Sequence, residues 1–360
     1  MVLNDAHEGL EMEAMQRFDF IDASIRLWER EIALGKLLSS WEKDEYPDFP
    51  GVIYRKDGRI VDTGTMPYLS DLEYLPSCAG ILRDVPLDRY GAAAITTGRG
   101  CPMSHTFCMY SRTDMRRRKV EDVVAEMEAV SDLGRAMIMD PSMPTIAEWR
   151  EALCDRLIAR NVKVSWRTDA KLQQCSPDTL KKLKAAGCAS IMLVVETLDS
   201  GVGGKVRGGI SHRNLKTGIE NIKGAGIVPI PVFFIGFPWD SSETLAEVES
   251  FLKEVAVPSF ILKQVRPWSG TALYEDCKEL GLLKRDLGID DYVHSDNPVI
   301  DTLYLSREEI MEWKYRIRRG AILNWRYIFS FMFERKRVTS RQAGLFLRLV
   351  AGSKGGWDGN

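Results

Sequence analysis

The chain has 360 residues, of which 45% are hydrophobic and 28% are charged, and its net charge at pH 7 is −2. This is the composition of an ordinary soluble globular protein that is long enough for one large core with appendages. The seven cysteines form no disulfide framework and the acidic N-terminus has no apolar secretory core, so we expect a cytoplasmic, reducing environment. The longest apolar stretch, residues 227–239, is interrupted by two prolines and is too short to cross a bilayer.

Residues 1–90 are predicted to form a small N-terminal appendage. Residues 29–41 have the spacing of an amphipathic helix, and residues 51–61 have the pattern of a β-hairpin closed by an Asp-Gly turn. Residues 71–76, Asp-Leu-Glu-Tyr-Leu-Pro, follow as a linker. About 45 residues precede the hairpin, which is too few for a doubly wound sheet, because such a domain needs on the order of 100 residues.

Two cysteines and a histidine lie close together just after a short strand-like run. Cys101, His105 and Cys108 have the spacing C-x3-H-x2-C, and the neighbouring glycines and proline allow the chain to bend around one centre. Thiolate and neutral imidazole are the soft ligands of iron–sulfur and zinc sites. The spacing therefore predicts a metal centre in this loop.

From residue 92 to about residue 267 the sequence alternates strand and helix signals six times, which is typical of a parallel α/β sheet. We interpret the glycine-rich segment 200–209 as a mobile loop, because glycine weakens a helical turn. The predicted strands are 92–96, 136–139, 162–166, 189–195, 227–235 and 260–265. The predicted helices are 119–133, 146–160, 177–187, 212–225 and 242–255.

Polar residues follow several of these strands. In a barrel of parallel strands, ligand groups collect at the carboxyl ends of the strands. Each residue also has a structural interpretation, because an Asp before a Pro commonly forms a turn and a strand-end Arg commonly forms a surface ion pair. The candidates, besides the Cys-His-Cys loop, are Asp140, Arg167, Asp169, Glu196 and Arg266.

Residues 284–360 are predicted to form a helical C-terminal extension. Ser306 and Glu309 have the spacing of a capping box. Residues 314–348 carry ten Lys or Arg against one acidic residue, with aromatic residues interleaved. We favour helices that pack on the barrel and expose their arginines. Association with the periphery of an anionic membrane, or RNA binding, are the alternatives.

The loop at residues 97–108 resembles the cluster loop of the radical S-adenosylmethionine (SAM) superfamily, R-G-C-x3-C-x2-C with an aromatic residue before the last Cys. Arg99-Gly100-Cys101 and Phe107-Cys108 match this pattern, and His105 stands at the second Cys. The resemblance covers about residues 45–280 and implies a partial (β/α)6 barrel. It also implies a [4Fe–4S] cluster held by Cys101, His105 and Cys108, whose open iron binds SAM and whose reduction yields a 5′-deoxyadenosyl radical.

The same resemblance implies roles for residues outside the loop. Residues 194–197, Val-Val-Glu-Thr, are similar to the family's G-v-E-s segment, which implies that Glu196 accepts hydrogen bonds from the SAM amino group. Asp140 aligns with a position that faces the substrate cavity. The hairpin and linker resemble those of the cobalamin-binding members, so the short appendage is interpreted as the remnant of a cobalamin domain. The residues implied for cofactor binding are Phe107, Arg167, Glu196 and Gly236.

His105 leaves three interpretations open. Imidazole is neutral where thiolate is anionic, so a His ligand raises the reduction potential of a cluster, whereas cleavage of SAM needs a strongly reducing one. Either His105 ligates iron, or the cluster is lost, or another cysteine such as Cys78 or Cys188 takes its place. Val194, at a position where the family has Gly, is a second departure beside the expected SAM site.

We therefore expect an enzyme that cleaves SAM reductively for methyl transfer or another C–H functionalisation. The main alternative is a cluster-deficient protein of the same fold that binds SAM or a partner, and a zinc or RNA-binding module is the third. The enzyme would take a small-molecule or lipid-like substrate and an electron donor such as flavodoxin or ferredoxin, and nucleic acid is not expected as a partner. The predicted domains are 1–90, 91–283 and 284–360.

Overall fold

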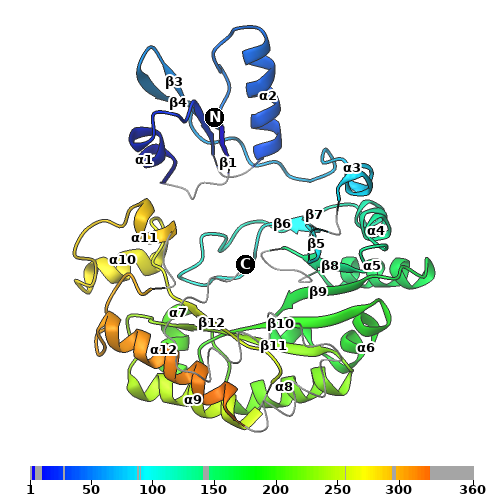
Figure 1. Ribbon diagram of the computed structural model, residues 1–360, viewed down its shortest axis with the longest axis vertical. Coiled ribbons are helices and arrows are strands. Elements are labelled where there is room, and N and C mark those ends of the chain that lie inside the picture. Colours follow the sequence, from blue (N-terminus) through cyan, green and yellow to red (C-terminus); the bar gives the residue numbers. More distant parts are fainter. Residues whose placement is uncertain are drawn as a thin grey trace.

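The computed structural model describes residues 2–4, 10–26, 29–86, 89, 91–140, 146–255, 257–293 and 297–324. These residues form a four-stranded sheet, a six-stranded sheet and a two-stranded pair. The six-stranded sheet curls through the lower part of the molecule in Figure 1, and the four-stranded sheet lies above its concave side.

The N-terminal sheet has the strand order β1-β2-β3-β4 and is accompanied by α1 (Leu10–Arg17) and α2 (Arg30–Glu42). β3 and β4 form the predicted hairpin, and its turn residues Asp57 and Gly58 both have positive φ, 50° and 72°, as a type I′ turn requires. The strands are β1 (Val2–Asn4), β2 (Ala23–Ile25), β3 (Val52–Lys56) and β4 (Arg59–Asp62).

The six-stranded sheet is parallel throughout and has the order β12-β11-β10-β9-β8-β5. Each strand therefore lies beside its predecessor in the sheet, which confirms the predicted α/β architecture, a partial (β/α)6 barrel (Figure 1). The strands are β5 (Ala93–Ile95), β8 (Arg135–Ile138), β9 (Ser165–Ala170), β10 (Cys188–Glu196), β11 (Val228–Ile235) and β12 (Ile261–Gln264).

Helices cover the convex side of this sheet, and the main core lies between the two layers (Figure 1). Trp166 and Phe233 contribute the largest fully buried side chains of the strands. Ser176 caps α6 (Pro177–Ala185) by accepting a hydrogen bond from the amide of Thr179, with Pro177 in the first turn. The helices are α4 (Val120–Ala129), α5 (Ala147–Ala159), α6 (Pro177–Ala185), α8 (His212–Gly224) and α9 (Ser242–Val255).

Two segments differ from the sequence expectation. β9 ends at Ala170 and not at Trp166, because Arg167 and Asp169 alternate with the buried Thr168 and Ala170, so the polar residues belong to the strand. The glycine-rich segment is not a loop. It forms α7 (Ser200–Val206), because Asp199 caps it and two buried valines of the helix anchor it in a satellite core.

The remaining elements of the described chain are the long helix α12 (Arg307–Ile322) and several short helices and strands. α12 starts at the predicted capping box of Ser306 and Glu309 and lies along α9, where Arg316 pairs with Glu249 at 2.9 Å. The others are α3 (Ala79–Asp84), β6 (Gly98–Arg99), β7 (Arg116–Arg117), a 3-10 turn (Leu172–Gln174), α10 (Ala272–Glu279) and α11 (Ile289–Val293).

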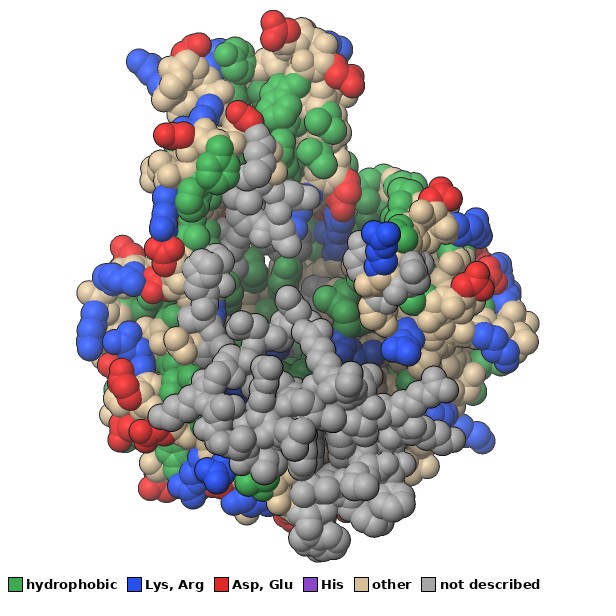
Figure 2. Space-filling view, viewed as in Figure 1, with side chains coloured by type: hydrophobic (Ala, Val, Ile, Leu, Met, Phe, Trp, Pro, Cys, Tyr) green, Lys and Arg blue, Asp and Glu red, His purple; other side chains and the backbone are tan. Residues whose placement is uncertain are grey.

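Residues 325–360, which contain most of the basic stretch, lie outside the described part of the chain. Within the described part, no helix combines the length and the apolar character that crossing a membrane requires. On the face seen in Figure 2, Lys and Arg side chains are interspersed with Asp and Glu around the rim, in keeping with the small net charge.

Candidate functional site: the Cys-His-Cys loop and the adjoining cavity

The Cys-His-Cys loop is closed at its base by two short antiparallel strands. In this pair Gly98 lies opposite Arg117 and Arg99 lies opposite Arg116. Gly100 has φ +89°, and a Cβ atom there would lie 1.9 Å from the carbonyl oxygen of Asp114, so no other residue fits without moving the backbone. The base of the loop thus depends on the glycine of the Arg-Gly-Cys motif.

The loop carries the three predicted metal ligands. Cys101 is buried and Cys108 is half-buried. Burial raises the pKa of the Cys108 thiol, the neighbouring Cys101 raises it further, and the Lys171 ammonium lowers it. The described residues contain no group of three or more His, Cys, Asp or Glu arranged to hold a metal ion, so the ligand assignment stays a prediction.

His105 is in contact with two charged side chains at the carboxyl end of the sheet. Its Nε2 atom lies 3.2 Å from Nζ of Lys171 and 3.3 Å from Oε1 of Glu196. Lys171 also donates a hydrogen bond to Glu196. Burial lowers the pKa of His105, and the Lys171 charge lowers it further against the opposing effect of Glu196, so the imidazole is neutral at pH 7.

Glu196 is held in a strained backbone conformation. Its φ is +64°, in the left-handed region that side-chain-bearing residues rarely adopt, and the register of β10 with β11 shifts at this point. The residue is completely buried, and its Oε2 accepts a hydrogen bond from the amide of Gly209 at 3.2 Å. Strain of this kind is concentrated at functional sites, which supports the predicted importance of Glu196.

A cavity of about 510 Å³ opens beside this contact. His105, Lys171 and Glu196 line one part of it, and the glycine-rich α7 with the following residues 207–211 lines another. Lys171 was not among the sequence candidates, because β9 was expected to end at Trp166. With the strand ending at Ala170, Lys171 is the first residue after its carboxyl end, where a barrel places its ligand groups.

Phe107 has a packing role in this structure. Its ring stacks on His105 with a centroid distance of 5.4 Å, and it contacts Phe234 at 5.1 Å and Phe237 at 5.5 Å. These contacts fix the imidazole plane against the satellite core. These packing contacts do not test the predicted role of Phe107 in cofactor binding.

Asp140 lies in the barrel but is enclosed. Its carboxylate accepts hydrogen bonds from the amides of Thr97 at 2.7 Å and Gly98 at 3.3 Å, from the Thr97 hydroxyl, and from Arg117 at 2.7 Å. Burial raises the pKa of Asp140 against the effect of these donors. The side chain is 1% exposed, so the structure gives it the role of an anchor for the start of the loop, and the predicted contact with substrate stays a prediction.

Arg167 and Gly236 do not line the cavity. The guanidinium of Arg167 donates to the sulfur of Met137 and interacts electrostatically with Asp169 on the concave face of the sheet. Gly236 has φ +88°, and its amide donates to the buried carboxylate of Asp240 at 2.8 Å. Asp240, which was not among the sequence candidates, organises the Gly236-Phe237-Pro238 turn.

Parts of this chain are similar to known proteins. Residues 95–252 match the family model of the Radical SAM superfamily. An uncharacterized methyltransferase of Pyrococcus horikoshii is 22% identical over 273 residues, which cover 72% of this chain and 59% of that protein. The bacteriochlorophyllide d C-8(2)-methyltransferase of Chlorobaculum tepidum is 22% identical over 251 residues, which cover 64% of this chain and 53% of that protein.

Two solved structures share the fold. The radical SAM methyltransferase TsrM of Kitasatospora setae, with cobalamin and a [4Fe–4S] cluster bound, has a TM-score of 0.64 at 15% identity and covers 84% of this chain and 62% of its own. The cobalamin-dependent SAM radical enzyme OxsB has a TM-score of 0.56 at 18% identity and covers 78% of this chain and 42% of its own. Residues 95–252 are therefore similar to the Radical SAM superfamily, and the chain spans little more than half the length of the curated relatives it matches.

Proposed function

We propose that the protein is a radical SAM enzyme that transfers a methyl group or carries out another C–H functionalisation. The observation that carries the proposal is that the loop of Cys101 and Cys108 and the Lys171–Glu196 pair meet at the carboxyl end of one parallel barrel, where His105 contacts both charged residues. The similarity to methyltransferases supports the choice of methyl transfer.

The donor set of the loop fits an iron–sulfur cluster in its chemistry. Two thiols and an imidazole with a lowered pKa supply soft ligands, and the Lys171 charge partly offsets the burial that raises the pKa of Cys108. Cys101, His105 and Cys108 would hold a [4Fe–4S] cluster, which when bound supplies the electron for reductive cleavage of SAM. To act as a ligand through Nε2, His105 has to exchange its contacts with Lys171 and Glu196 for iron.

The cavity beside the loop suits the amino acid part of SAM. Glu196 offers a buried carboxylate for an ammonium group, and Lys171 offers an ammonium group for a carboxylate. The Gly209 amide binds the other carboxylate oxygen of Glu196, Oε2, at 3.2 Å. The chain can thus bind and orient a zwitterionic amino acid group with residues that come from β10, from the end of β9 and from the segment after α7.

The concave face of the sheet supplies polar groups for a small-molecule substrate. Arg167 and Asp169 alternate with buried residues on β9, and Lys263 lies in register with Phe234 on the neighbouring strands β12 and β11. Asp169 interacts electrostatically with both cations, and burial raises its pKa. These groups favour a substrate with polar or charged substituents. A lipid-like substrate at a membrane periphery is a hypothesis that rests on residues 314–348, most of which lie outside the described part.

An external electron donor such as flavodoxin or ferredoxin is part of the proposal, because the reaction consumes an electron. We assign cobalamin no binding residues. The TsrM and OxsB structures contain it, whereas the described N-terminal residues of this chain form a four-stranded mixed sheet with two helices and not the doubly wound sheet of a complete cobalamin domain.

The test is anaerobic reconstitution with iron and sulfide, followed by electron paramagnetic resonance of the dithionite-reduced protein with and without SAM. We expect a [4Fe–4S]⁺ signal that shifts when SAM is added and that Cys101→Ala abolishes. A native protein that binds no cluster, together with a His105→Cys variant that does, would refute the proposal and support the cluster-deficient alternative.

A further inference from the structure

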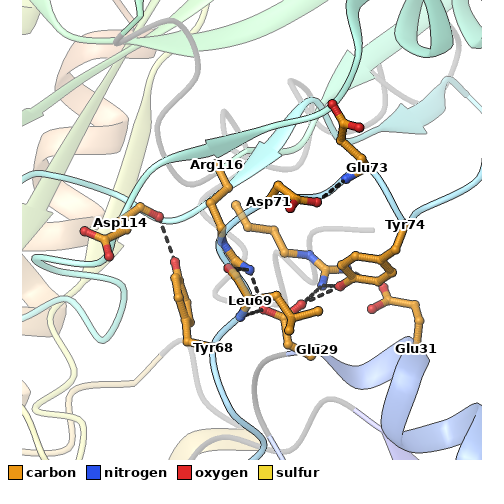
Figure 3. Close-up of polar contacts among 10 residues, drawn as sticks. Glu29, Glu31, Tyr68, Leu69, Asp71, Glu73, Tyr74, Asp114 and Arg116 are labelled. Carbon is orange, nitrogen blue, oxygen red and sulfur yellow. Dashed lines mark hydrogen bonds and ion pairs between the residues drawn. The ribbon is translucent and has the colours of Figure 1, made fainter.

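The N-terminal unit is the four-stranded sheet with α1 and α2, described over residues 2–4, 10–26 and 29–62. The carboxylate of its residue Glu29 is completely buried at the base of the Cys-His-Cys loop. It accepts hydrogen bonds from the Tyr74 hydroxyl, from Nη1 of Arg116, from Nη1 of Arg99 at 3.3 Å, and from the amide of Leu69 at 3.3 Å (Figure 3). The four donors come from residues 69–74 and from both strands at the base of the loop. One side chain of the N-terminal unit thus binds three separate segments of the chain.

This position of Glu29 is unfavourable for its backbone and for its solvation. Its φ is +43°, in the left-handed region, at the residue that precedes α2. Burial by itself raises the pKa of Glu29, but the hydrogen bonds from Tyr74 and Arg116 outweigh burial and hold the pKa below its usual value. A buried charge on a strained residue persists only where the surrounding structure determines it strongly.

The two arginines bound by Glu29 are partners in the β6–β7 pair, where Arg99 lies opposite Arg116. Arg99 belongs to the Arg-Gly-Cys motif, and Arg116 follows the loop at its other end. Arg116 also donates to the carbonyl of Leu69 at 2.7 Å, and its guanidinium carbon lies 3.7 Å from the centre of the Tyr68 ring. The Tyr68 hydroxyl in turn donates to the carbonyl of Asp114 at 2.7 Å (Figure 3).

We infer that Glu29 is a positioning residue for the Cys-His-Cys loop, and that the N-terminal unit serves to hold this loop in the geometry its cysteines need. Glu29 bridges the two strands from outside, because its carboxylate binds one arginine of each strand. Without that charge the two cationic side chains repel each other across the base of the loop. The inference deepens the proposed function by giving the N-terminal unit a role there, but its test uses protein without a cluster.

Glu29→Gln in the full chain removes the charge and keeps the size of the side chain. We expect Cys108 in cluster-free protein to react with iodoacetamide about tenfold faster than in the unmodified chain, and hydrogen exchange of residues 98–117 to accelerate in parallel. Cys175, buried in the barrel core, serves as the internal reference. General destabilisation would raise both cysteine rates together, whereas loss of positioning raises the rate at Cys108 relative to Cys175.

The matched control is Glu31→Gln. Glu31 also binds Arg99, but its side chain is 51% exposed and it does not contact Arg116. We expect less than about a twofold change from it. If Glu29→Gln does not fold, Arg99→Gln breaks the bridge to β6 without creating repulsion between two cations, and it should raise the Cys108 rate to a smaller extent.

A folded Glu29→Gln chain with unchanged Cys108 reactivity and unchanged exchange over residues 98–117 would overturn the inference. After reconstitution we further expect a lower iron content per chain and a broadened cluster signal for this variant. Failure of the native chain to take up a cluster would count against the proposed function but not against the positioning role, since the alkylation result does not depend on iron.

Discussion

Nζ of Lys171 lies 3.2 Å from Nε2 of His105, although 66 residues separate them in the sequence. A cation beside an imidazole disfavours the protonated ring. Burial lowers the pKa of His105, and this contact lowers it further. The contact also engages Nε2, one of the two ring nitrogens through which His105 could bind a metal.

Lys171→Gln should raise the pKa of His105. The substitution removes a charge that lowers this pKa and leaves Glu196, which raises it, so we expect an upward shift. The imidazole signals of His105 in an NMR titration of the cluster-free protein measure the shift directly. Lys205→Gln, at an exposed lysine of α7 that contacts Trp239, is the control and should leave the His105 titration unchanged. An unchanged pKa of His105 in Lys171→Gln would show that the Lys171 charge does not contribute to it.

Gly203→Ala and Gly204→Ala should have opposite effects on stability, although the residues are neighbours in α7. A Cβ atom at Gly203 would lie 2.8 Å from the carbonyl oxygen of Gly208, so we expect a loss of about 1–3 kcal/mol. A Cβ atom at Gly204 meets nothing within 4 Å, and there alanine should gain about 0.5–1 kcal/mol through its helix propensity. Urea unfolding followed by circular dichroism compares the two. Equal effects would contradict the close approach of α7 to residues 208–209.

Asp140→Asn should destabilise the protein strongly, because it leaves the buried guanidinium of Arg117 without its carboxylate. The side chains of Arg117 and Asp140 are 6% and 1% exposed, and removing one partner of such a pair costs about 3–5 kcal/mol. The measurement is the free energy of unfolding in urea. Asp155→Asn breaks an exposed pair with Lys182 and should change little. A similarly small effect at Asp140 would mean that the pair contributes nothing to stability.

Asp240 should make the protein less stable as the pH rises from about 4 to 7. Burial raises the pKa of Asp240 to about 7 against the hydrogen bonds from the amides of Phe237 and Gly236. Over this range the folded state therefore holds a proton that the unfolded state has released, and stability falls with increasing pH.

Asp240→Asn, which cannot ionise, should reduce that slope. We expect the variant to gain at least about 1 kcal/mol relative to the unmodified chain between pH 5 and pH 8, given about 1.36 kcal/mol per unit of pKa. Unfolding free energies at several pH values test this. Parallel pH profiles for the two proteins would exclude Asp240 as the titrating group.

Most of the barrel could be predicted from the sequence, because its signals are local. Buried parallel strands need apolar runs, and helices need caps such as Ser176 and Ser306, so six strands in chain order follow from the pattern alone. The hairpin at Asp57-Gly58 is local in the same way, since two adjacent residues with positive φ determine its turn. The candidate ligands Cys101, His105 and Cys108 are likewise marked by their spacing within one short segment of the chain.

The surroundings of that loop depend on contacts between segments that are distant in the sequence. Because β9 contains polar residues, its end cannot be located from the hydrophobic pattern. The sequence therefore does not identify Lys171 as the partner of His105 and Glu196. Glu29 contacts Arg99 and Arg116, which are 70 and 87 positions away in the sequence, and no local sequence pattern predicts such contacts. Capping and periodicity act within a few residues of the chain, whereas burial and charge pairing depend on which distant segments the finished fold brings together.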